Sequence, residues 1–70
     1  MDNREDPAIY VIRIHGVLGD RLLAAFAGMD ARTDRGNTVL TGPLPDQPAL
    51  HALLGEIEAL GLELLGVQRT

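Results

Sequence analysis

A five-residue pattern, Gly-x-Leu-x-Asp, occurs twice in this chain of 70 residues. The first copy spans residues 16–20 and the second spans residues 42–46. Each copy follows a run typical of a strand and precedes a run typical of a helix. The chain therefore reads as one strand–turn–helix unit used twice. This pattern constrains the fold closely, but it points to no particular reaction.

Hydrophobic spacing predicts four strands and two helices around the two copies. Strands are predicted over residues 8–15, 30–34, 38–42 and 62–69, a first helix over 20–27, and a second helix from Asp46 or Gln47 to Leu60. Arg35-Gly36-Asn37 is predicted to form a hairpin turn. Residues 8–70 then form a single domain behind a disordered tail over residues 1–7.

Apolar residues at strand and helix periods predict the core. In the first strand, Tyr10, Ile12 and Ile14 share one face, and Ile9, Val11, Arg13 and His15 share the other. The helices add two apolar stripes, Leu22, Leu23 and Phe26 in the first and Leu50, Leu53, Leu54, Ile57 and Leu60 in the second. Pro48 marks the start of the second helix, and Gly61 followed by Leu62 marks its end.

The predicted element order is strand–helix–strand–strand–helix–strand. Two right-handed crossovers give a four-stranded antiparallel-type sheet with both helices on one face. We therefore predict the ferredoxin-like βαββαβ fold of the α+β class. The first and third strands lie at its centre, and the charged second strand, Asp30–Asp34, suits an edge.

Composition argues against several classes of function. The chain has no cysteine and two histidines, which excludes disulfides, thiolate sites and a histidine-rich metal site. Its net charge of −4 argues against nucleic acid or an anionic membrane as a partner. An RNA-binding sheet needs aromatic residues on its free face, and only Tyr10 is available. The polar N-terminus and the lack of a long apolar run predict a cytoplasmic protein, and we expect no metal or cofactor.

The size of the chain favours self-association. A domain this short buries about 60% of its unfolded surface, so its stability is marginal without support. In the last strand Leu64 is expected on one face, and Leu65 and Val67 on the other, so both faces need cover. We expect a homo-oligomer through the edge of this strand or through the free sheet face; the alternative is a well-packed monomer. The predicted interface residues are Val11, Arg13, Leu62, Leu64, Leu65 and Val67.

The two repeat copies form a candidate ligand site. We expect both at the same end of the central strands, with two helix N-termini side by side to attract an anion. Two carboxylates and one imidazole there are also suited to a shared divalent cation. The simpler interpretation is structural, because Asp caps helices, Gly permits turns and Leu fills the core. The candidate residues are His15, Gly16, Gly19, Asp20, Gly42 and Asp46.

The histidines form no recognisable catalytic motif. His15 ends the first strand, and His51 lies early in the second helix. His51 and Glu56 are five residues apart, off the spacing that places two ligands on one helical face. We therefore predict a protein that is not an enzyme. A small dimeric enzyme with either histidine in an interface pocket is a third alternative.

Several runs resemble a family of short uncharacterised proteins from actinobacteria. They are Thr38-Val39-Leu40-Thr41-Gly42, Asp46-Gln47, Ala49-Leu50-His51-Ala52-Leu53-Leu54 and Leu60-Gly61-Leu62-Glu63-Leu64. The resemblance covers most of residues 9–69 and implies no activity. The close of the chain is also similar to that of ACT domains, small βαββαβ regulators that pair side by side. Their ligand lies near the first strand–helix loop, where this chain has Gly16 and Gly19.

Two functions of different classes follow from these observations. The first is a non-enzymatic interaction or regulatory module that acts as a homo-oligomer on a partner protein. The alternative is an ACT-like sensor that binds a small ligand at the two strand–helix loops.

Overall fold

The computed structural model describes residues 8–70, so the predicted tail over residues 1–7 lies outside the described residues. Its elements are β1 (Ala8–Ile14), α1 (Asp20–Leu23), the 3-10 turn η1 (Ala24–Phe26), β2 (Asp30–Asp34), β3 (Asn37–Leu44), α2 (Gln47–Ala59) and β4 (Leu64–Arg69). The predicted order of strands and helices is confirmed.

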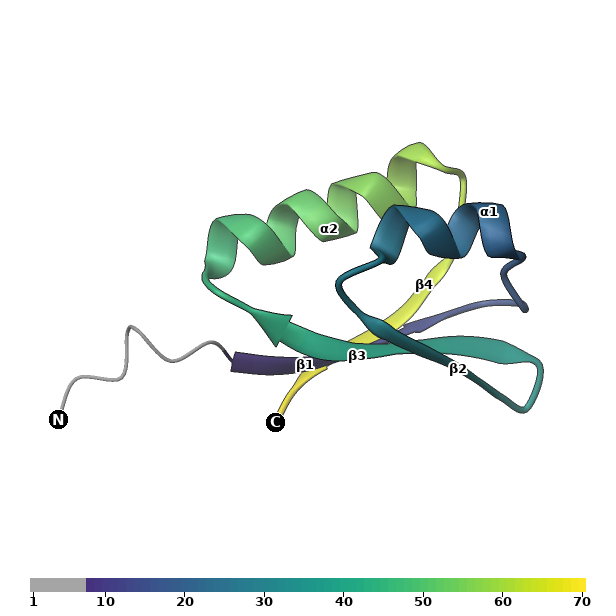
Figure 1. Ribbon diagram of the computed structural model, residues 1–70, viewed down its shortest axis with the longest axis horizontal. Helices are drawn as coiled ribbons and strands as arrows, with labels where there is room; N and C mark the ends of the chain where they lie inside the picture. Colours follow the sequence, from purple (N-terminus) through teal and green to yellow (C-terminus); the bar gives the residue numbers. More distant parts are fainter. Residues whose placement is uncertain (1–7) are drawn as a thin grey trace, which may run out of the picture.

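The strands form one sheet in the order β2-β3-β1-β4, and every neighbouring pair is antiparallel. Both helices lie on the same face of this sheet, as Figure 1 shows. The arrangement confirms the ferredoxin-like α+β fold, with β1 and β3 central and β2 and β4 at the edges. No helix of residues 8–70 has the length and apolar character that crossing a bilayer requires.

The core lies between the sheet and the helices. Ile12 and Ile14 of β1 and Leu40 of β3 are completely buried, and Ile12 lies directly opposite Leu40 in the ladder. Phe26 and Ile57 close the core from the helix side, with 3% and 1% of their surface exposed. Aliphatic packing therefore accounts for most of the core, as the composition indicates.

Helix α2 begins and ends as its sequence predicts. The Asp46 carboxylate accepts a hydrogen bond from the Ala49 N–H at 2.9 Å and so caps the helix. At the other end, Gly61 adopts a φ of 76°. The Leu62 N–H donates to the Ile57 carbonyl at 3.1 Å, and the Gly61 N–H donates to the Glu58 carbonyl at 3.0 Å. These two bonds form a Schellman motif.

The first helix is shorter than predicted. The α-helical part stops at Leu23, and a 3-10 turn carries the chain to Phe26 instead of a helix to Ala27. Gly19, not Asp20, is its N-cap, and no side chain caps it. A helix this short has little stability of its own, so the burial of Phe26 decides the path of its last turn.

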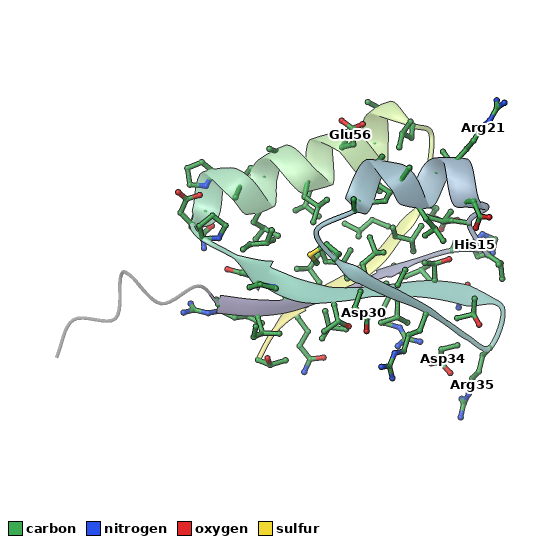
Figure 2. The ribbon with its side chains drawn as sticks, in the orientation of Figure 1. His15, Arg21, Asp30, Asp34, Arg35 and Glu56 are labelled. Carbon is green, nitrogen blue, oxygen red and sulfur yellow. The ribbon has the colours of Figure 1, made fainter. Side chains whose placement is uncertain are left out.

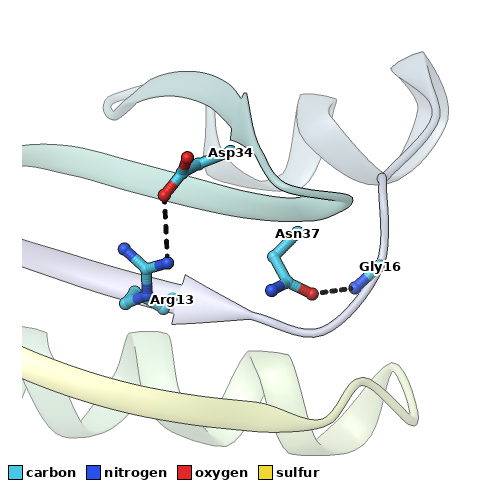
Figure 3. A network of polar contacts seen from close by, with 4 residues as sticks. All are labelled: Arg13, Gly16, Asp34 and Asn37. Carbon is cyan, nitrogen blue, oxygen red and sulfur yellow. Dashed lines mark hydrogen bonds and ion pairs between the residues drawn. The ribbon is translucent and has the colours of Figure 1, made fainter.

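The β2–β3 hairpin has a two-residue turn instead of the predicted three. Arg35 and Gly36 have φ values of 56° and 82°, the signature of a type I′ turn. Asn37 is therefore the first residue of β3, opposite Asp34. Its side-chain oxygen accepts a hydrogen bond from the Gly16 N–H at 3.1 Å, shown in Figure 3.

A buried hydroxyl fixes the loop between β1 and α1. The Thr38 hydroxyl donates to the Gly16 carbonyl at 2.7 Å and accepts from the Leu18 N–H at 3.0 Å. Thr38 is 2% exposed, and Leu18 is 8% exposed beside it. The start of β3 therefore holds the loop that leads into the first helix.

Replacing Thr38 by Val should destabilise the protein by about 1–3 kcal/mol, because the buried Leu18 N–H and Gly16 carbonyl lose their partner. Urea unfolding measures this difference. Thr41→Val is the matched control, since Thr41 lies on the opposite face of the same strand. Equal stability of the two variants would show that the hydroxyl bridge contributes nothing.

Gly42 of β3 allows the turn before β2 to approach closely. A Cβ at this position would lie 2.8 Å from the Met29 sulfur and 3.3 Å from the Gly28 carbonyl oxygen. Gly42→Ala should therefore cost about 1–3 kcal/mol in urea unfolding, as overpacked sites do. Gly55→Ala, in open space on α2, should instead add about 0.5–1 kcal/mol by raising helix propensity. A stabilised Gly42→Ala protein would refute the close contact.

Candidate functional site

The two repeat copies lie at opposite ends of the sheet. Strands β1 and β3 are antiparallel, with Ala8 opposite Leu44 and Ile14 opposite Thr38. Residues 16–20 follow the end of β1, whereas Gly42 lies near the other end of the same ladder. The expectation of adjacent helix N-termini is therefore wrong. The physical reason is that the central strands of this fold run in opposite directions, so the loops that follow them point apart.

The two copies also have different conformations. Gly16 turns the chain with a φ of 88°, whereas Gly42 lies inside β3 in extended structure. Asp46 caps its helix, as the structural interpretation predicts, but Asp20 is the first helical residue and does not. The repeat is therefore a similarity of sequence without a shared local structure.

The candidate cation ligands are not brought together. His15, labelled in Figure 2, directly follows the end of β1, whereas Asp46 follows β3 at the opposite end of the β1–β3 ladder. Its ring nitrogen Nδ1 is 4.0 Å from the Glu63 carboxylate, and both side chains are about 70% exposed, at 68% and 71%. His51 is exposed near the start of α2. Within residues 8–70, no three histidine or acidic side chains gather as a metal site requires.

A bulge in β4 decides which of its side chains face the helices. Val67 lies opposite Ile12 and Leu64 lies opposite Ile14, with a register shift between Arg13 and Ile14. Because Ile12 and Ile14 are buried under the helices, Leu64 and Val67 both point to the helix side. The prediction that they face opposite sides is wrong, because the bulge inserts Leu65 between the two paired positions.

The predicted interface residues therefore divide between two faces. Val11 and Arg13 alternate with the buried isoleucines of β1 and lie on the free face. Leu62, Leu64 and Val67 belong to the helix side. No single face of the sheet therefore contains all the predicted interface residues. The free-face residues and the helix-side residues both adjoin the edge of β4.

The free face of the sheet is charged along β2. The Arg13 guanidinium contacts the Asp34 carboxylate at 3.1 Å, as Figure 3 shows, and Arg32 lies 3.7 Å from Asp30. Val39 is only 7% exposed on this face, between Arg13 and Arg32 in the register. The aliphatic parts of two arginine side chains can shield an apolar residue that lies between them, as Val39 does here.

The helix side of β4 is apolar and incompletely covered. A groove of about 350 Å³ lies along it, lined by Leu54, Ile57, Glu58, Leu62 and Leu64. The three large apolar residues of β4, which we call the edge patch, are Leu64, Leu65 and Val67, with 41%, 45% and 39% of their surface exposed. Single exposed apolar residues are ordinary, but here three lie on one edge strand beside a groove.

Sequence reasoning missed Glu58 and Gly66 at this surface. Glu58 is not part of the predicted apolar stripe of α2, yet it lines the groove. Gly66 lines a second hollow of about 160 Å³, together with Val11, Arg13, Val67 and Gln68. The available signal was a glycine inside a predicted strand, which often marks a close approach of another backbone.

Comparisons with curated proteins and with solved structures gave no match. The sequence does match one protein family, described as "Domain of unknown function (DUF8691)", over residues 9–68. This span includes both helices, β2, β3 and the whole edge patch, and it leaves out only Ala8 of β1 and Arg69 of β4 among the residues of the strands. The match agrees with a resemblance to uncharacterised proteins. The chain belongs to this DUF8691 family.

Proposed function

We propose that this protein is a small non-enzymatic interaction module that works as a homodimer through the edge of β4. The observation that carries the proposal is the edge patch, three large apolar side chains on a strand that, among residues 8–70, is paired on one side only. An apolar edge strand attracts another strand, because its outward N–H and carbonyl groups need partners and its side chains need cover. A second copy of the chain supplies both.

The opposite edge of the sheet is protected from such pairing. Strand β2 is exposed at all five positions and includes Asp30, Arg32 and Asp34. Charged side chains of this kind discourage strand addition. The contrast between the two edges favours a closed dimer over an open chain of molecules, because only one edge of each copy is suited to pairing.

The free sheet face is the less favourable surface for a dimer. Packing two such faces together would bury the Arg13–Asp34 and Arg32–Asp30 pairs. Desolvating these charges costs more than their attraction returns unless new hydrogen bonds form. Val39, the central apolar residue of this face, is already buried within one chain. These observations favour the β4 edge of the two routes to a dimer.

Sedimentation equilibrium at micromolar concentration should find the unmodified protein as a dimer. Val67→Lys should raise the dissociation constant by on the order of tenfold or more, because a lysine on an edge strand opposes pairing. Val67 is already 39% exposed, so a lysine there can extend its charged end into water and circular dichroism should show a folded monomer.

Val17→Lys is the matched control for this experiment. Val17 is 63% exposed in the loop after β1, outside β4 and outside the lining of the groove. It receives the same change in charge and should leave the dimer intact. A folded, monomeric unmodified protein at these concentrations would rule out the proposal.

A further inference from the structure

We infer how the two copies pair: their β4 strands lie antiparallel, with Gly66 of each chain meeting at the two-fold axis. This inference rests on the proposed dimer and adds its register. It joins two four-stranded sheets into one continuous sheet, with all helices on the same side. Four observations carry it, from the backbone, the glycine, the edge patch and the charges.

The backbone of β4 shows which of its groups are free. The Thr70 N–H donates to the Ile9 carbonyl of β1 at 2.9 Å. Hydrogen-bonding direction alternates along an antiparallel strand, so Gln68 and Gly66 also turn their groups toward β1. The groups of Val67 and Arg69 point outward and are available to a second copy. Residues next to them, such as Gly66, then meet the partner in pairs without hydrogen bonds.

Within one chain, neither backbone conformation nor a steric contact requires a glycine at position 66, which lies beside the bulge. Its φ is not positive, unlike that of Gly16, Gly36 and Gly61. A Cβ built on Gly66 would meet nothing within 4 Å. Glycine in a strand interior nevertheless weakens the strand, so a position like this one needs another reason. Non-hydrogen-bonded pairs bring two Cα atoms to about 4.5 Å, the closest approach in an antiparallel sheet, which suits glycine.

This register also covers the edge patch. With Gly66 at the axis, Val67 of one copy lies beside the Leu64–Leu65 bulge of the other. Leu64 and Val67 both point to the helix side, so the four side chains from two copies form one apolar row. The row adjoins the groove beside α2 of each copy, which Leu64 lines. It covers Leu64 and Val67, whose side chains are 41% and 39% exposed in a single chain.

The charges at the two ends of β4 are complementary in this arrangement. Arg69 lies opposite the buried Tyr10 and therefore on the helix side. Glu58 lines the groove on that same side, near Leu64 at the start of the strand. An antiparallel partner brings its Arg69 end to the Glu58 end of the first chain. A parallel partner would instead place like charges together.

A cysteine at Gly66 tests the register. The chain has no cysteine of its own, so any disulfide in Gly66→Cys reports this one position. The open space around Gly66 accommodates the side chain, and paired Cα atoms at the axis lie within the range of about 4.4–6.8 Å that a disulfide allows. Mild oxidation should link Gly66→Cys into dimers on the order of tenfold faster than Gly55→Cys, because pairing raises the effective thiol concentration.

Gly55→Cys is the matched control, since a Cβ at Gly55 on α2 also meets nothing within 4 Å. Equal cross-linking of the two variants, with the unmodified protein dimeric by sedimentation, would overturn the register and leave the dimer standing. A monomeric unmodified protein would overturn both. The two proposals therefore fail in distinguishable ways.

Charge reversal provides a second, independent test. Glu58→Arg and Arg69→Glu should each weaken self-association by about fivefold to tenfold, since each creates two like-charged contacts per dimer. An equimolar mixture of the two variants should restore dimers, because both contacts then join opposite charges. Glu56→Arg, on the side of α2 that points away from the sheet in Figure 2, should have no effect. Failure of the mixture to form heterodimers would contradict the antiparallel arrangement.

Discussion

The burial of Ile12 and Ile14 in the central strand is the constraint on which the rest of this structure depends. Both side chains are completely buried, and they are paired with β3 on one side and β4 on the other. Their position decides which face of the sheet the helices cover. It also decides which residues of β4 point toward the helices, because partners opposite each other share a face. The core and the exposed edge are therefore two consequences of the same pairing.

The bulge in β4 connects this core to the proposed function. Without the extra residue, strict alternation would send Leu64 and Val67 to opposite faces. With it, both lie on the helix side and both are partly exposed, and Leu64 lines the groove beside α2. Bulges are common at sheet edges, where they redirect side chains or end the pairing. Here the bulge gathers apolar surface on one side of an unpaired edge, and this asymmetry supports a dimer over a monomer.

The loop between β1 and α1 has a structural role in this chain. Thr38 and Asn37, both from the start of β3, accept or donate the hydrogen bonds that hold Gly16 and Leu18. Strand β3 thus fixes this loop. The Gly16 N–H, the Gly16 carbonyl and the Leu18 N–H all have hydrogen-bond partners there. The loop at the other end holds Asp46, whose carboxylate caps α2. A shared ligand site would need these two loops close together, and the antiparallel central strands separate them.

The sequence by itself determined the order of the elements, the ferredoxin-like topology, the charged edge at β2 and both ends of α2. These features depend on neighbouring residues: alternation in β1, the Asp46–Pro48 start and the Gly61–Leu62 end act over a few positions. Tertiary structure decided the length of the first helix, where the burial of Phe26 outweighs the weak stability of a short helix. It also placed the two repeat copies at opposite ends of the sheet, and it decided which side chains of β4 point toward the helices. Those depend on strand direction and on one inserted residue in a ladder, which are set by pairing between distant segments and not by local spacing.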